Sequence, residues 1–281
     1  MALANVMGRH RGMPAQDGAG VKLTRVINQP SLKHQDPFLM LDEFRSDNPN
    51  DYIAGFPPHP HRGFCTLTYM LAGRMEHKDS VGNTGVVEAG GAQWMKAARG
   101  IIHAEMPKQE SGLMWGFQLW LNLPAKDKMT DAAWADHPAH AIPQAVEPGY
   151  TLKLVAGDWQ TTTGKQLSGP IQQPERRFLM ADVIVDAEQT INLASQAQAQ
   201  RLLYVYQGEG EVNGASASRG ELLRLSADGE LAVTTATGIG FILLAAEPIG
   251  EPIVQYGPFV MNKPEEIEQA IRDYQAGRLT A

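Results

Sequence analysis

Short apolar segments, separated by glycine, proline and asparagine, recur along the chain and predict strands. Three of them stand in the first half of the chain, at 64–71, 86–95 and 112–123. Five more follow in the second half, at 150–156, 178–185, 202–206, 222–225 and 241–245. Within 115–121 the odd positions are apolar, whereas Gly116 and Gln118 lie between them, which is the alternation of a half-buried strand. These patterns predict an all-β protein.

The strand pattern is interrupted over 125–149 by polar residues, alanines and three prolines, as expected of a connection between domains. A length of 281 residues also favours two domains of about 140 residues each. A short internal echo agrees, because Tyr69, Gly73 and Glu76 recur at the same spacing as Tyr204, Gly208 and Glu211. We therefore predict one domain over 1–135 and a second over 136–281.

One helix is predicted at the C-terminus. Asn262 can cap its first turn, with Glu265 three residues later, and Gly277 can end it. The apolar stripe between them consists of Ile267, Ala270, Ile271 and Tyr274. Such a helix should pack on a barrel.

Composition excludes several classes of function. The net charge of −7 and the absence of a run rich in Lys and Arg argue against direct nucleic-acid binding. No segment approaches the roughly 18 apolar residues that span a bilayer, and the first residues lack the apolar stretch of a signal peptide. Cys65 is the single cysteine, so no intramolecular disulfide can form. We expect a cytoplasmic protein without a membrane segment.

Two pairs of side chains can bind a metal, and each pair is separated by one residue. They are His59 with His61, and His103 with Glu105. In a strand, residues i and i+2 project to the same face, whereas in a helix they diverge by roughly 200°. Three imidazoles and a carboxylate suit a first-row transition metal such as iron with open coordination positions, and the ligand types leave zinc open.

Each pair taken alone also fits an exposed edge strand with an irregular, proline-rich entrance. All eight histidines lie between His10 and His140, so a comparable site in the second half is not expected. His77, His137 and His140 are interpreted as surface or linker residues. Cys65 shares parity with the two histidines before it and should face the same interior if the strand continues unbroken, more as a small buried hydrophobe than as a redox thiol.

These residues belong to longer strings that resemble the pirin family of the cupin superfamily. The two strings are GFPPHPHRGF at 55–64 and QWMKAARGIIHAEMP at 93–107. Similar segments are LDEF at 41–44, QLWLNLP at 118–124 and QYGPFVMN at 255–262. The sequence departs from the pirin pattern at Cys65, where a glutamate is usual, and at Ala98, where a glycine is usual.

The resemblance implies two tandem cupin (jelly-roll) β-barrels and a C-terminal helix. It also implies one Fe(II), or another divalent transition metal, in the N-terminal barrel and none in the second barrel. The implied ligands are His59, His61, His103 and Glu105.

Pirins are similar to quercetin 2,3-dioxygenases, which cleave a flavonol with O₂ and release carbon monoxide. In that reading the substrate is a flavonol-like small molecule, and Glu105 accepts its hydroxyl proton. The alternative is a redox-sensing regulator that binds protein partners without turnover. A third reading is a degenerate cupin whose metal is only structural.

Overall fold

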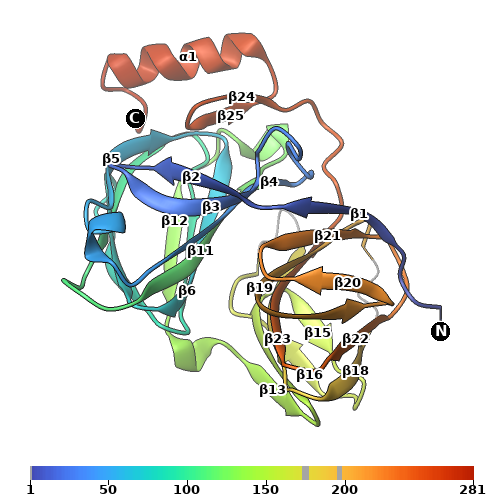
Figure 1. Cartoon of the computed structure of the whole chain (residues 1–281). Coiled ribbons are helices and arrows are strands. Elements are labelled where there is room, and N and C mark those ends of the chain that lie inside the picture. Colours follow the sequence, from blue (N-terminus) through green and yellow to red (C-terminus); the bar gives the residue numbers. More distant parts are fainter. Residues whose placement is uncertain (1, 173–176, 195–197) are drawn as a thin grey trace. The chain divides into compact units, whose positions relative to one another are not determined.

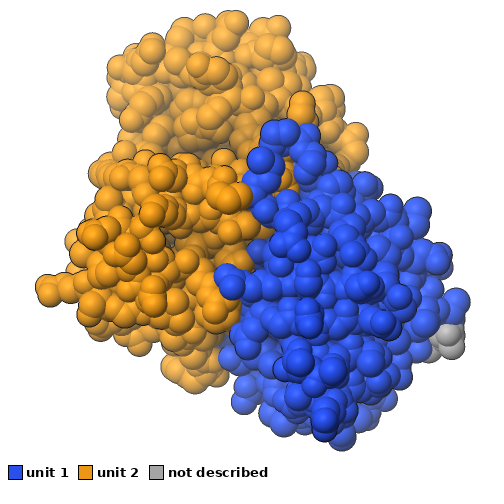
Figure 2. Space-filling view, viewed as in Figure 1, with its two compact units in different colours: residues 1–13, 30–32, 141–248 blue, residues 14–29, 33–140, 249–281 orange. Residues whose placement is uncertain are grey.

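The chain folds into strands along almost its whole length, as a computed structural model shows for residues 2–172, 177–194 and 198–281 (Figure 1). The prediction of an all-β protein with one C-terminal α-helix is confirmed. Two compact units are present. Unit 1 comprises 1–13, 30–32 and 141–248, and unit 2 comprises 14–29, 33–140 and 249–281 (Figure 2).

Unit 2 contains a seven-stranded and a four-stranded sheet. The first is formed by β2 (Met13–Asp17), β3 (Val21–Ile27), β4 (Phe38–Ser46), β6 (Phe64–Ala72), β9 (Ala92–Lys96), β11 (Met114–Asn122) and β12 (Ala133–His137). Its order is β12-β9-β6-β11-β4-β3-β2. The second is formed by β5 (Phe56–His61), β7 (Arg74–Asp79), β8 (Thr84–Glu88) and β10 (Ile101–Pro107), in the order β5-β10-β7-β8. Short 3-10 turns occur at Pro49–Asp51, Ala125–Asp127 and Ala139–Ala141.

Unit 1 is built on a ten-stranded sheet whose central path is β1-β21-β19-β23-β17-β14-β13. Its strands are β1 (Val6–Arg11), β13 (Gln144–Glu147), β14 (Tyr150–Ala156), β17 (Phe178–Val185), β18 (Gln189–Leu193), β19 (Gln200–Val212), β20 (Ala215–Ser218), β21 (Glu221–Leu225), β22 (Leu231–Thr235) and β23 (Ile239–Ala246). A separate hairpin joins β15 (Asp158–Gln160) to β16 (Gln166–Ser168). The interior is apolar, and Leu203, Val205, Val212 and Phe241 belong to one buried cluster.

The first residues of the chain belong to the unit formed mainly by the second half, and the last residues belong to the unit formed mainly by the first half. The expected division into 1–135 and 136–281 has neither feature. β1 pairs antiparallel with β21, so the first strand belongs to unit 1. Residues 249–281, with β24 (Val254–Tyr256), β25 (Phe259–Met261) and α1 (Pro264–Gln275), belong to unit 2. The expected connection at 125–149 also contributes β12, which pairs with β9.

Several boundaries differ from the sequence pattern for local reasons. The single strand predicted at 86–95 is two strands, β8 and β9, because the chain turns between them at Gly90, whose φ is 81°. Helix α1 starts one residue later than expected, with Lys263 at the N-cap position. The carboxylate of Glu266 accepts from the backbone N–H of Lys263, while the Asn262 side chain donates to Glu251 and Pro252 instead. No helix in the described part of the chain is long and apolar enough to cross a membrane.

The short sequence echo marks equivalent bends in the two units. Gly73 and Gly208 have φ values of 83° and 69°, a conformation that side chains with a Cβ rarely adopt. A Cβ at Gly208 would also collide with the carbonyl oxygen of Gly238. The residues around the two glycines therefore occupy matching places, β6 and β7 in unit 2 and β19 in unit 1.

Candidate metal centre

Three histidines meet in unit 2 on two paired strands. β5 runs antiparallel to β10, and His59 lies opposite His103 in their register. The ring centroid of His59 lies 4.7 Å from that of His61 and 4.4 Å from that of His103. The ring centroids of His61 and His103 are 4.9 Å apart. One ligating atom from each ring lies within 4.8 Å of the other two. β5 is an edge strand of its sheet, a place where prolines are tolerated.

The environment of these rings keeps them in the form that binds metal. Burial, and then the neighbouring histidines, lower the pKa of both His61 and His103 well below the ordinary value, so both rings are neutral at pH 7. Nδ1 of His59 lies 2.8 Å from the carbonyl oxygen of Pro57, which fixes that ring. Nδ1 of His61 and Nε2 of His103 are buried and have no hydrogen-bond partner in the described residues. Unsatisfied buried ring nitrogens on neutral imidazoles fit a divalent transition metal.

Glu105 lies on the same strand as His103, in the interior of unit 2, with 5% of its surface exposed. Its carboxylate accepts a hydrogen bond from Thr68 Oγ1 at 2.9 Å and from Gln118 Nε2 at 3.5 Å. The Thr68 hydroxyl also lies 2.6 Å from Gln118 Oε1, and it can donate to only one of these partners at a time. Glu105 is outside the tight group formed by the three histidines.

An aromatic pair stands beside the histidines. The rings of Phe64 and Trp120 are stacked with centroids 4.3 Å apart. His61 makes edge contacts with both rings, at 5.0 and 5.1 Å. Within 117–121 of β11, Gln118 and Trp120 are half-buried, whereas Phe117, Leu119 and Leu121 are fully buried. The alternation predicted for this strand is therefore present over 117–121. The half-buried face, with Gln118 and Trp120, is the one near the histidines.

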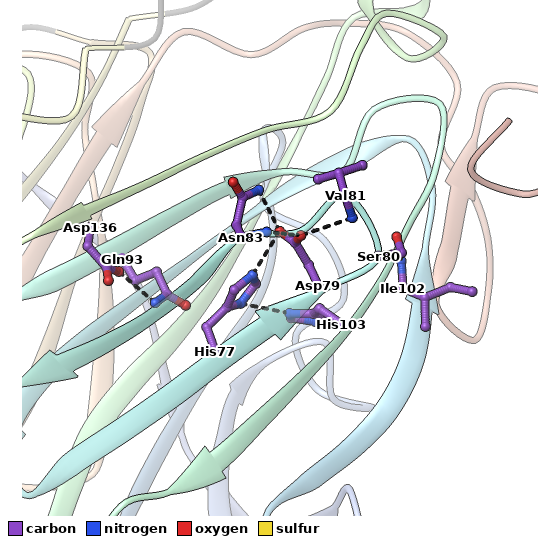
Figure 3. Close-up of polar contacts among 9 residues, drawn as sticks. All are labelled: His77, Asp79, Ser80, Val81, Asn83, Gln93, Ile102, His103 and Asp136. Carbon is purple, nitrogen blue, oxygen red and sulfur yellow. Dashed lines mark hydrogen bonds and ion pairs between the residues drawn. The ribbon is translucent and has the colours of Figure 1, made fainter.

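His77 is a site residue that the sequence interpretation missed. It was predicted to be a surface or linker residue, and this is wrong, because only 1% of it is exposed and its Nδ1 lies 3.3 Å from Nδ1 of His103 (Figure 3). The available signal was its i, i+2 spacing with Asp79 on one strand. His140 is exposed and His137 is half-buried.

Cys65 does not share the face of the histidines. β5 ends at His61 and β6 starts at Phe64, so the strand is broken at Gly63, whose φ is 93°. Phe64 contacts His61, and Thr68 reaches Glu105, so the even positions of β6 face the site. Cys65 is buried on the opposite face, and the condition for its predicted orientation is not met.

Comparison with known families agrees with the resemblance in the sequence. The sequence model of the pirin family matches residues 20–121, and that of the pirin C-terminal cupin domain matches residues 180–280. A Pseudomonas aeruginosa protein named "putative quercetin 2,3-dioxygenase" is 48% identical over 279 residues, which is 98% of each chain. Human pirin is 35% identical over 286 aligned positions, covering 92% of this chain and 88% of the relative.

Solved structures show the same architecture. A crystal structure of quercetin 2,3-dioxygenase from Acinetobacter baumannii has a TM-score of 0.90 and 29% identity, and the alignment covers 100% of this chain and 99% of that one. The bacterial pirin YhhW from Escherichia coli, in complex with nickel(II), has a TM-score of 0.64 and 18% identity, covering 86% and 99%. With two cupin domains and this similarity over its whole length, the chain belongs to the pirin family.

Proposed function

We propose that one divalent transition metal ion, Fe(II) in the native protein, binds in unit 2 and serves a flavonol-cleaving dioxygenase. The proposed ligands are His59, His61, His103 and Glu105. The observation that carries the proposal is the cluster of three imidazoles, of which two are buried and have a ring nitrogen without a hydrogen-bond partner in the described residues. Held by these residues, the ion would supply a Lewis acid that makes the hydroxyl of a 3-hydroxy-4-keto substrate easier to deprotonate.

Glu105 is assigned the proton transfer. A flavonol hydroxyl must lose its proton before the ring can react, and Glu105 is a buried carboxylate on the same strand as His103, two residues away. Hydrogen bonds from Thr68 and Gln118 hold the carboxylate in place. Glu105 would accept the hydroxyl proton when its carboxylate loosens from the metal, a role typical of a positioned general base.

We assign to the aromatic pair, Phe64 and Trp120, the role of orienting the substrate. Phe64 is fully buried and supports the half-buried ring of Trp120, which would offer a flat apolar surface next to His61 to a planar aromatic ligand. The relatives support the substrate class, because one is named a putative quercetin 2,3-dioxygenase and a solved neighbour is titled quercetin 2,3-dioxygenase. The nickel(II) in the pirin YhhW supports a divalent ion in this fold.

We further propose a cytoplasmic protein that binds no nucleic acid directly. The net charge of −7 and the single cysteine support this assignment. A protein partner is the other candidate ligand, and it belongs to the regulatory alternative in which the oxidation state of iron changes a binding surface.

The test is turnover under controlled metal content. Protein prepared without oxygen is loaded with Fe(II), mixed with quercetin, and exposed to O₂ while O₂ uptake and carbon monoxide release are recorded. We expect both gases to change in equal amounts with the quercetin consumed, and metal-free protein to be inactive. Loaded protein that binds iron but leaves quercetin intact would refute the dioxygenase and leave redox-dependent partner binding as the function to measure.

A further inference from the structure

A chain of polar contacts leads from the histidine cluster to β7, the next strand of the same four-stranded sheet. Nδ1 of His103 lies 3.3 Å from Nδ1 of His77, and Nε2 of His77 lies 3.1 Å from Oδ2 of Asp79 (Figure 3). In the register of β7 and β10, Asp79 lies opposite His103. The side chains of His77 and Asp79 are 1% and 0% exposed, so these direct contacts are shielded from bulk solvent.

Asp79 is held as an acceptor by its surroundings. Its Oδ1 accepts from the backbone N–H groups of Val81 and Asn83, at 3.1 and 2.9 Å, and its Oδ2 accepts from Asn83 Nδ2 at 2.8 Å. Burial alone would raise the pKa of Asp79, but the hydrogen bonds from Asn83 and His77 outweigh it and lower the pKa. Three N–H donors from Val81 and Asn83 point at the carboxylate, so Asp79 is an acceptor in this chain of contacts.

With a single proton on the His77 ring, the hydrogen bonds along the chain have one arrangement. Because Asp79 only accepts, that proton is on Nε2 of His77, and Nδ1 of His77 is then an acceptor. Nδ1 of His103 must donate to it. The lone pair of His103 is left on Nε2, the atom that is buried without a hydrogen-bond partner in the described part of the chain.

We propose that Asp79 and His77 are positioning residues that hold His103 in the tautomer with the proton on Nδ1 and the lone pair of Nε2 directed to the metal. This inference rests on the metal centre proposed above. Such partners of a metal-binding histidine fix both the orientation of the ring and its basicity. We call Asp79, His77 and His103 together the relay. Trp134 stacks on His77, its middle residue, with ring centroids 5.5 Å apart and planes inclined by 22°, which holds that ring in place.

The second barrel supports a role in the site rather than in the fold. The echo that aligns Gly73 with Gly208 places Val212 at the position of His77 and Leu203 at the position of Thr68. Both residues are buried in the apolar core of unit 1. The same bend and strand therefore form with apolar side chains, so the polar relay of unit 2 is not needed to build the barrel.

Asp79→Asn is predicted to reverse the direction of both hydrogen bonds, the one between residue 79 and His77 and the one between His77 and His103. The amide oxygen takes the place of Oδ1, because two backbone N–H groups point at it. The NH₂ group then faces His77, and the side chain of Asn83 must turn its own amide oxygen toward that group. His77 Nε2 then becomes an acceptor, its Nδ1 carries the proton, and Nδ1 of His103 must accept. The proton of His103 moves to Nε2, and metal binding weakens because this proton must leave before Nε2 can bind the ion.

The experiment combines a metal titration with a direct measurement of the tautomers. Dissociation constants for Co²⁺ are measured for the wild-type protein, Asp79→Asn and the matched control Asp136→Asn, whose carboxylate accepts from Gln93 instead of His77. We expect Asp79→Asn to weaken Co²⁺ binding on the order of 10-fold to 100-fold, and the control to stay within about threefold of wild type. Nitrogen-15 NMR of metal-free protein should show the His103 proton on Nδ1 in wild type and on Nε2 in Asp79→Asn.

A second variant separates the relay from a merely structural effect. In His77→Gln the carboxamide can turn its oxygen toward His103 whatever residue stands at 79, so adding Asp79→Asn should change the Co²⁺ affinity less than about threefold. If Asp79 had only a structural role, the losses of Co²⁺ affinity caused by His77→Gln and by Asp79→Asn would instead add in the double variant.

Equal Co²⁺ affinity in Asp79→Asn and wild type, or a wild-type His103 with its proton on Nε2, would overturn the relay. The wild-type NMR measurement needs no variant to fold. Wild-type protein that binds no Co²⁺ would refute the metal centre, while the tautomers of the metal-free protein would still test the relay separately.

Discussion

Arg62 offers a test of how the C-terminal segment is attached to the metal-binding barrel. It follows His61 directly, and its guanidinium is 4% exposed. Nη1 donates to Asp273 Oδ2 at 2.8 Å, Nη2 donates to the carbonyl of Leu279 at 3.1 Å, and Nε donates to the carbonyl of Arg99. One side chain thus ties the end of β5 to α1 and to the residues after it.

Arg62→Met keeps the apolar stem and removes the guanidinium. Removing one partner of a fully buried ion pair costs about 3 to 5 kcal/mol. Asp273 is 18% exposed and can recover part of its hydration, which lowers this cost, but two carbonyl groups also lose their donor. We therefore expect a loss of about 3 kcal/mol in the free energy that holds α1 on unit 2. Asp273→Asn should cost only about 1 kcal/mol, because the guanidinium keeps its other two acceptors.

The assay must be local, because a chain of two units need not unfold in one step. Hydrogen exchange of the amides in Pro264–Gln275 reports the opening of α1 directly. The control is Arg272→Met, which removes an exposed guanidinium from the same helix and should change protection by less than about 0.5 kcal/mol. Protection in Arg62→Met within about 1 kcal/mol of wild type would refute the reasoning, since removing one partner of a buried ion pair should destabilise the helix by more than this.

Three further predictions concern buried groups and the second barrel. Burial lowers the pKa of Lys128 to about 8 from 10.5, so the unfolded chain binds more protons between these values. The free energy of unfolding of wild type relative to Lys128→Met should rise by up to about 3 kcal/mol from pH 8 to pH 10.5, and a flat difference in denaturant titrations would contradict it. Glu105→Gln should reduce quercetin turnover per bound iron by about 10² to 10⁴, whereas an unchanged per-iron rate would leave Glu105 as a ligand only. Anomalous scattering from Fe(II)-loaded crystals should show one strong peak per chain, and a second peak within 150–260 would disprove the metal-free second barrel.

The sequence was informative where the local pattern determines the structure. Alternation over 115–121 and the apolar runs at 150–156 and 178–185 correspond to β11, β14 and β17, because a pleated strand needs only the period of two. The i, i+2 spacing of His59 and His61 likewise places both rings on one side of β5.

The features that were missed depend on contacts between distant segments. No local pattern shows that residues 6–11 pair with 221–225, or that 249–281 belongs with the first barrel. The break at Gly63 inverts the expected orientation of Cys65, since a single turn residue changes the parity of the strand after it. His77 looked like a surface residue because its partners, His103 and Trp134, lie on other strands.

Metal content per chain tests the central claim most directly. The wild-type protein and the variants His59→Ala, His61→Ala and His103→Ala are purified without oxygen, loaded with Fe(II), freed of excess ion and analysed for iron, with circular dichroism as the check on folding. We predict about one iron per chain in wild type and less than about a tenth of that in each folded variant, because each loses one of only a few protein ligands. Full iron occupancy in any folded variant, or none in wild type, would contradict the proposed metal centre.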